Sequence, residues 1–158
     1  MTGNGHAPFV SSPIRAKIIL VIATVGVALA AADTYVVVLA LTDMMADVGI
    51  TIDALQKATP IISGFLLGYI AFLPLIGRLS DLVEHGRVVQ LCLLIFILGS
   101  IVTSLATDLP VLVGGRVLQG IGGGGLLPAT LALVASLWPA DKRGMPLGIV
   151  GGVQEFGA

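Results

Sequence analysis

Three residues in this sequence could carry charge inside segments that are otherwise apolar, Asp33, Arg116 and Glu155, and Gln119 adds a neutral amide that can form hydrogen bonds with them. A lone charge costs about 2.5–3.5 kcal/mol at the centre of a membrane helix, so each charged side chain needs a partner or a hydrated cavity. Burial disfavours the charged form of a carboxylate and a nearby cation favours it, so such a group can be poised to bind and release a proton. Asp33 and Glu155 are therefore candidate proton carriers.

The segments that must hold these residues are long and apolar. The chain has 158 residues, of which 56% are hydrophobic and 11% charged, whereas a soluble domain carries about 25% charged residues. This composition predicts an all-α membrane protein, and the formal net charge of −1 identifies no partner. After a disordered cytoplasmic segment at 1–17, transmembrane helices are expected at about 18–41, 55–78, 88–107, 111–138 and 144–158.

The two ends of the chain each leave an alternative open. The triplet Ala28-Leu29-Ala30 is typical of a signal-peptide cleavage site, but apolar residues resume after Asp33 and give about 24 residues, enough for a retained helix that spans the bilayer. The last apolar run offers about 15 residues, which reach about 22 Å into a core that is ~30 Å thick. We therefore expect the sequence to be a fragment of a longer protein.

The distribution of basic residues predicts the orientation of the helices. The segment before the first helix and the second and fourth connections carry pairs of basic residues, and the other two connections have Lys57 alone. By the positive-inside rule the N-terminus is cytoplasmic, in a protein of the plasma membrane. Asp33 and Arg116 then both lie about 22 Å above the cytoplasmic face. We expect them to pair or to share a hydrated cavity, because pairing offsets the cost of burying both charges; a purely structural ion pair is the alternative.

Arg116 begins a helix face that is polar or lacks side chains. Gln119, Gly120 and Gly123 follow it at helical spacing. Gly120 and Gly124 form a G-x-x-x-G pair, so a helix packing surface is the alternative to a cavity lining. Packing alone does not require a charge, which favours a cavity in which Arg116 and Gln119 act as charge partners.

Glu155 is expected near the midplane of the membrane, about 11 residues into its helix. It shares a face with Gly148, Gly151 and Gly152, so its carboxylate projects from a smooth strip that could line a cavity. The alternative is that Glu155 lies near a true chain end and contacts water.

Two motifs resemble signatures of one transporter family. The pattern Arg-x-x-Gln-Gly-x-Gly, from Arg116 to Gly122, resembles the fourth-helix signature of proton-coupled exporters of the major facilitator superfamily. Residues 77–87 (GRLSDLVEHGR) are similar to its loop signature G-x-L-[AS]-D-x-x-G-R-[KR], with Gly86 five residues after Asp81 instead of three.

A third resemblance narrows the family. Residues 32–41 (ADTYVVVLAL) resemble the first-helix signature of the fourteen-helix drug:proton antiporters in this superfamily, L-D-x-T-[IV]-V-N-[VI]-A-L. Asp33 matches its aspartate, whereas Tyr35 and Val38 replace the usual threonine and asparagine. The resemblance therefore implies substrate contacts that are more apolar than in typical drug exporters.

The resemblance implies the first four to five helices of a major facilitator N-terminal half, with a role for each motif. Asp33 and Glu155 would couple transport to protons, and Arg116 with Gln119 would be their charge partners in the cavity. The loop would latch the cytoplasmic side of the transporter through Gly77, Asp81, Gly86 and Arg87. A solvated charged loop is the alternative.

These observations predict a secondary transporter that exports hydrophobic drugs or lipids in exchange for protons by alternating access. Protons are the coupling ion, and neither another cofactor nor a metal is expected, because the sequence has no metal-ligand cluster, catalytic triad or phosphate-binding loop. The expected partners are the bilayer, the substrate, a missing C-terminal half and, by the resemblance, a lipoprotein, but no nucleic acid. The alternative is a complete small multi-span membrane protein with a structural or assembly role; enzymatic activity is not expected.

Overall fold

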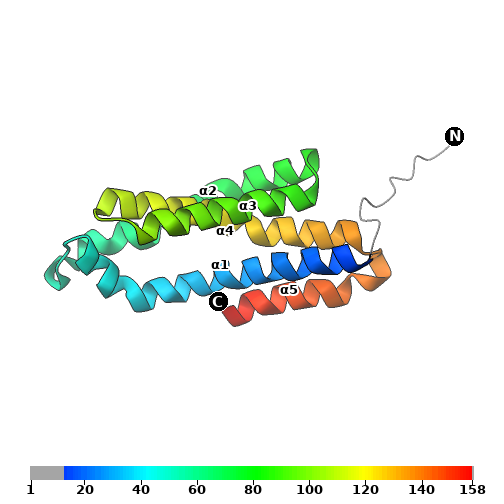
Figure 1. The fold of residues 1–158 in the computed structure, drawn as a ribbon, viewed down its shortest axis with the longest axis horizontal. Coiled ribbons are helices and arrows are strands. Elements are labelled where there is room, and N and C mark those ends of the chain that lie inside the picture. The colour runs from blue at the N-terminus through cyan, green and yellow to red at the C-terminus, as the bar shows by residue number, and fades with distance from the viewer. Residues whose placement is uncertain (1–12, 158) are drawn as a thin grey trace.

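The computed structural model describes residues 13–157 as a bundle of antiparallel helices (Figure 1). Its elements are α1 (Pro13–Asp47), η1 (Ile52–Ala58), α2 (Thr59–Leu82), α3 (His85–Ser104), α4 (Leu109–Leu137), η2 (Ala140–Lys142) and α5 (Gly144–Gly157). In this part of the chain, α1 to α4 are each long and apolar enough to cross a membrane. The predicted all-α membrane fold is confirmed.

Helix α4 lies at the centre of the bundle. It packs chiefly against α2 and α3, whereas α1 lies against α4 and α5. The start of α1, the α2–α3 turn and the α4–α5 connection lie together at one end of the bundle, and η1 lies at the other (Figure 1). The connections that hold most of the basic residues are therefore on one side.

The helices extend beyond the apolar runs from which they were predicted. Helix α1 begins at Pro13 instead of 18 and ends at Asp47 instead of 41. Helix α2 continues to Leu82, so the predicted polar loop at 78–87 is reduced to a two-residue turn at 83–84 before α3. Hydropathy marks only the part of a helix that suits hydrocarbon, and hydrogen bonding can continue the helix into the polar interface.

Local sequence signals explain two helix starts. Asp108 caps α4, because its Oδ1 accepts a hydrogen bond from the Val111 amide at 2.9 Å, which satisfies one of the free donors at a helix N-terminus. Pro60 stands in the first turn of α2, where its missing N–H costs nothing. Residues Ile52–Ala58 form η1, so α2 begins at Thr59 and not at 55 as predicted.

Glycines let α4 approach both neighbouring helices at backbone distance. A Cβ atom at Gly120 would overlap the carbonyl oxygen of Phe65 on α2, and one at Gly122 would lie 2.5 Å from the amide nitrogen of Phe96 on α3. Gly124 likewise lies against Tyr69. The face that begins at Arg116 is thus a packing surface as well as the position of a polar group.

We expect Gly120→Ala to lower the stability of the protein by about 1–3 kcal/mol, because its methyl group must push α2 away from α4. Gly114→Ala on the same helix is the matched control, since its new Cβ would meet no other described side chain or helix within 4 Å. Alanine there should leave stability unchanged or raise it by up to about 1 kcal/mol. Thermal unfolding of each variant in detergent measures the difference, and equal midpoints for the two would contradict this account of the packing.

Candidate functional site

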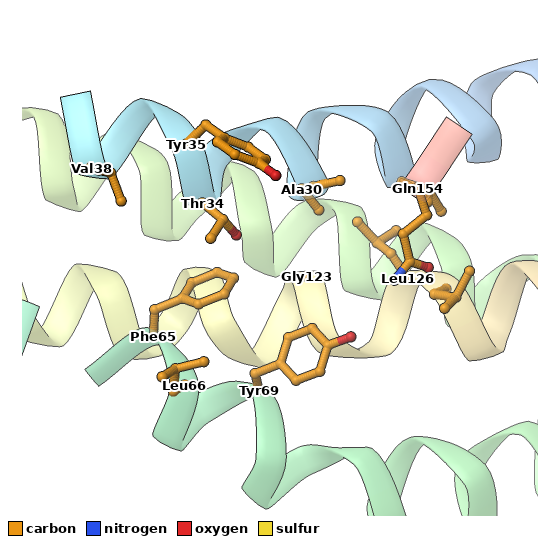
Figure 2. Close-up of a pocket in the computed structure, with 13 residues that line it drawn as sticks. Ala30, Thr34, Tyr35, Val38, Phe65, Leu66, Tyr69, Gly123, Leu126 and Gln154 are labelled. Atoms are coloured by element: carbon orange, nitrogen blue, oxygen red, sulfur yellow. The ribbon is translucent and has the colours of Figure 1, made fainter. Parts of the chain in front are cut away.

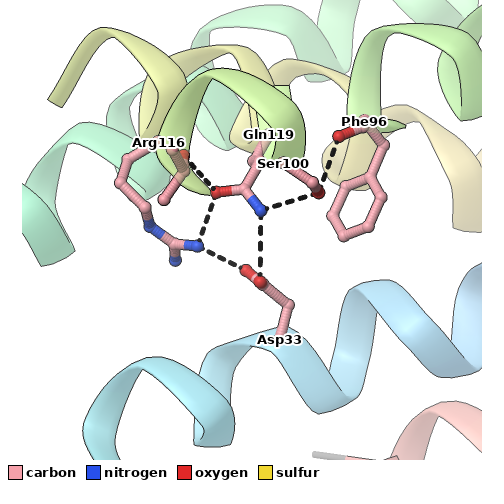
Figure 3. A network of polar contacts seen from close by, with 6 residues as sticks. Asp33, Phe96, Ser100, Arg116 and Gln119 are labelled. Carbon is pink, nitrogen blue, oxygen red and sulfur yellow. Dashed lines mark hydrogen bonds and ion pairs between the residues drawn. The ribbon is translucent and has the colours of Figure 1, made fainter. Parts of the chain in front are cut away.

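Asp33 of α1 and Arg116 of α4 form an ion pair across the bundle (Figure 3). The Nη1 atom of Arg116 donates a hydrogen bond to Oδ2 of Asp33 at 2.6 Å. The Arg116 side chain is 2% exposed and the Asp33 side chain 15%. The two residues are therefore brought together as their equal depths predict, and Asp33 retains some access to its surroundings.

Gln119 completes the contacts of this pair. One turn along α4 from Arg116, its Oε1 accepts from Arg116 Nη1 at 2.8 Å and its Nε2 donates to Asp33 Oδ1 at 3.3 Å. The opposite orientation of the amide would place its NH₂ group against the guanidinium, so the network fixes which way Gln119 points. Both oxygens of Asp33 thus accept a hydrogen bond.

Helix α3 holds Gln119 in place through two hydroxyl groups. Thr103 Oγ1 donates to Gln119 Oε1 at 3.1 Å, and Gln119 Nε2 donates to Ser100 Oγ at 2.9 Å. Ser100 in turn donates to the carbonyl oxygen of Phe96 at 2.9 Å. Neither hydroxyl was predicted from the sequence; the available signal is their spacing of three residues, which puts both on one face of an apolar helix.

Phe65 of α2 covers the Arg116 guanidinium. The Arg116 Cζ atom lies 4.7 Å from the centre of the Phe65 ring, within the range of a cation–π interaction. The Nε atom of Arg116 is buried with no hydrogen-bond partner among the described residues. A phenylalanine within an apolar run does not indicate by itself that it covers a guanidinium. The contact between Phe65 and Arg116 could therefore not be predicted from the sequence.

An apolar pocket of about 370 Å³ is lined by Phe65 but not by Arg116 (Figure 2). Helices α1 and α2 face each other across it, with Gly123 of α4 between them. Its lining is mainly aliphatic and aromatic and includes Ala30, Thr34, Tyr35, Val38, Phe65, Leu66, Tyr69, Leu126 and Gln154. Tyr35 and Val38, the two departures from the antiporter signature, thus both line this pocket.

Asp33 lines two further cavities. The first, which we call the polar cavity, has a volume of about 310 Å³ and is also lined by Asp47, Thr103, Arg116 and Gln119. The second, the α1–α3 groove, has a volume of about 620 Å³ and is lined chiefly by apolar side chains of α1 and α3. Both members of the ion pair therefore line the polar cavity and neither lines the apolar pocket, whereas Phe65 lines that pocket and contacts the guanidinium.

The other predicted proton carrier, Glu155, is exposed on α5. Its neighbour Gln154, and not Glu155, lines the apolar pocket. The described residues do not bring Glu155 to the ion pair, and its role in proton coupling stays a prediction.

The predicted latch is described only in part. Gly77 lies in α2 and Gly86 in the first turn of α3, whereas the Asp81 side chain lies outside the described residues. Arg87 pairs with Glu84 through an Nε–Oε2 distance of 3.4 Å, and both side chains are exposed. An exposed pair of this kind contributes little to stability, and the latch stays a prediction.

Residues 23–158 match the Major Facilitator Superfamily. The chain therefore belongs to this superfamily, as its motifs predict, and is a multi-pass membrane protein of a transport family rather than an enzyme.

Several proteins similar to this chain come from mycobacteria. The chain is 56% identical to a triacylglyceride transporter of Mycolicibacterium hassiacum, over 84% of this chain and 25% of that protein. It is 47% identical to a triacylglyceride transporter of Mycobacteroides abscessus, over 100% of this chain and 31% of that protein, and 46% identical to one of Mycobacterium tuberculosis, over 85% and 27%. The chain thus spans about a quarter to a third of the length of these relatives.

Proposed function

We propose that this chain is the N-terminal part of a proton-coupled exporter of triacylglycerides or similar hydrophobic molecules. The observation that carries the proposal is the buried Asp33–Arg116–Gln119 network beside an apolar pocket. The relatives are named for triacylglyceride transport, and a pocket lined by Tyr35 and Val38 suits acyl chains better than polar drugs. Transport would require the whole protein, because substrate sites in such folds lie between two halves.

The network supplies a chemical reason for proton coupling. Ionised Asp33 binds Arg116 through a short, charge-assisted hydrogen bond that ties α1 to α4. A proton on Asp33 removes the negative charge and weakens this tie, so protonation and the relative position of the two helices become linked. In our proposal protons enter as lipid leaves, Arg116 and Gln119 hold the carboxylate, and Glu155 is a second proton carrier.

We propose that the N-terminus is cytoplasmic, in the plasma membrane. The start of α1, the α2–α3 turn and the α4–α5 connection lie at one end of the bundle. The basic residues of these segments support the assignment of that end to the cytoplasm. The latch formed by Asp81 and Arg87 would act on this side, and a lipoprotein partner would receive the lipid on the other.

Reconstitution tests the proposal directly. Full-length protein in liposomes with an imposed proton gradient should move a labelled triacylglyceride against its concentration difference. A protonophore should abolish accumulation while leaving exchange of labelled for unlabelled lipid intact. Accumulation that persists without a proton gradient would contradict proton coupling, and exchange of a polar drug but not of lipid would contradict the proposed substrate class.

Phe65 should link the pocket to the ion pair, because one ring lines the pocket and covers the guanidinium. We expect Phe65→Leu to weaken lipid binding, because the pocket loses an aromatic wall. It should also lower the number of protons moved per lipid, because Arg116 loses a cation–π contact of about 0.5–2 kcal/mol that links it to the pocket. Tyr69→Leu is the matched control: Tyr69 lines the same pocket, with its ring 6.1 Å from that of Phe65. It should weaken binding alone, and an unchanged coupling ratio in both variants would remove Phe65 from the mechanism.

A further inference from the structure

The polar cavity follows α1 from the ion pair to the end of the helix. It is lined by Asp33 at one end and by Asp47 at the other; the two positions are about 21 Å apart along a helix that rises 1.5 Å per residue. Asp47 is exposed, whereas Asp33 is largely covered. The cavity thus connects a buried carboxylate to the surface at the end of the bundle opposite the basic connections.

The walls of the polar cavity can hold water. Its volume of about 310 Å³ has room for about ten molecules at ~30 Å³ each. Ser100, Thr103 and Ser104 of α3 lie along it, and a hydroxyl group can donate and accept hydrogen bonds within a chain of water molecules. The apolar pocket also carries hydroxyl groups, on Thr34, Tyr35 and Tyr69, but no charged side chain of the described residues lines it, whereas Asp33, Asp47 and Arg116 line the polar cavity.

We infer that protons reach Asp33 through the polar cavity, from the end of the bundle at Asp47, along a path separate from the apolar pocket that would hold the lipid. Arg116 is the charged group that faces Asp33 from α4, and α3 presents the hydroxyl groups of Ser100 and Thr103. Asp47, on the same helix as Asp33, places a negative charge at the mouth, which raises the local concentration of cations. The inference rests on the proposed role of Asp33 in proton coupling.

A separate path has a functional consequence. A lipid in the apolar pocket excludes water from that side of the ion pair, so protons supplied through the same pocket would have to wait until the lipid leaves. If protons instead pass through the polar cavity, Asp33 can exchange them with the non-cytoplasmic side of the membrane, at the Asp47 end, while lipid is bound. The wall between the two routes is the Arg116 guanidinium stacked on Phe65.

The test places a plug in the polar cavity after the protein has folded. Val48 lines this cavity near its mouth and lies outside the ion-pair network, so Val48→Cys in the full-length protein is modified with a bulky cationic thiol reagent. Leu105→Cys is the matched control, because Leu105 lies near the same end but lines the α1–α3 groove. Cys92 is buried, and wild-type protein treated with the reagent reports any effect at that residue.

Modified Val48→Cys should lose proton-driven lipid export by at least about tenfold, because proton transfer by a positioned side chain contributes about 10²–10⁴-fold and the plug cuts off its proton supply. It should retain lipid exchange in the absence of a gradient, and modified Leu105→Cys should retain both activities. Equal loss of export and exchange, or no loss of either, would overturn the separate path. Lipid export by Asp33→Asn is measured in parallel. If export by Asp33→Asn is still driven by protons, the proposed function fails. If Asp33→Asn loses proton-driven export but modified Val48→Cys keeps it in full, only the separate path is rejected.

Discussion

Asp33→Asn should abolish proton-driven lipid export by the full-length protein while leaving lipid exchange intact. Asparagine has nearly the shape of aspartate and can still accept a hydrogen bond from Arg116, but it carries no charge and binds no proton. The step that links protonation to movement of α1 against α4 is therefore lost, whereas the apolar pocket, which Asp33 does not line, is unchanged. We expect export to fall by at least about a hundredfold, the size of effect that follows loss of an essential proton-transfer group.

The measurement is uptake of labelled triacylglyceride into liposomes with and without a proton gradient, at equal amounts of inserted protein. Asp43→Asn is the matched control, because Asp43 lies on the same helix but is exposed and lines none of the cavities described above. It should behave as wild type. Retained proton-driven export in Asp33→Asn would assign the coupling to another group, of which Glu155 is the first to examine by Glu155→Gln.

The arrangement of the spans was predictable because it depends on properties that a single segment carries by itself. Hydrophobic length identifies each membrane helix, and successive helices joined by short connections must cross the bilayer in alternating directions. Together they place Asp33 and Arg116 at one depth, and the structure brings these two side chains into contact. The helix ends were less predictable, since the polar residues of α1 after 41 continue the helix outside the apolar run.

The remainder of the site depends on how the helices are rotated against one another. Phe65 and Ser100 lie in apolar runs, and each could have faced lipid without any change in the hydropathy of its helix. Their contacts with Arg116 and Gln119 arise because glycines such as Gly99 and Gly120 bring α3 and α2 onto α4 at backbone distance. A sequence shows which faces are smooth, but the pairing of one smooth face with another requires the packed bundle.

The two apolar clusters of the core place this network between them. One contains Val27 of α1 and Leu126 of α4, and the other contains Val37 of α1 and Leu112 of α4. Asp33 and Arg116 therefore form a polar layer within a packed interior, where any change in their charge acts on both helices at once. This position makes the energetic coupling between the two residues measurable.

Arg116→Ala should be the most destabilising single substitution in the network, at about 3–5 kcal/mol, because it leaves Asp33 as a buried charge without a cation. Adding Asp33→Asn to it removes that charge, so the double variant should be more stable than Arg116→Ala alone. The interaction energy from the double-mutant cycle should lie at about 1–3 kcal/mol, as for residues in one hydrogen-bonded network. Unfolding of the four proteins in detergent measures this cycle.

Arg116→Lys separates the charge of Arg116 from its shape. Lysine keeps the positive charge but lacks the planar group that stacks on Phe65 and donates from Nη1 to both Asp33 and Gln119. We expect it to recover part of the stability lost in Arg116→Ala while export stays low, because the contact between the apolar pocket and the ion pair is still broken. Strictly additive losses of stability in Asp33→Asn and Arg116→Ala would contradict the pairing of these residues. Full export by Arg116→Lys would show that position 116 requires only a positive charge.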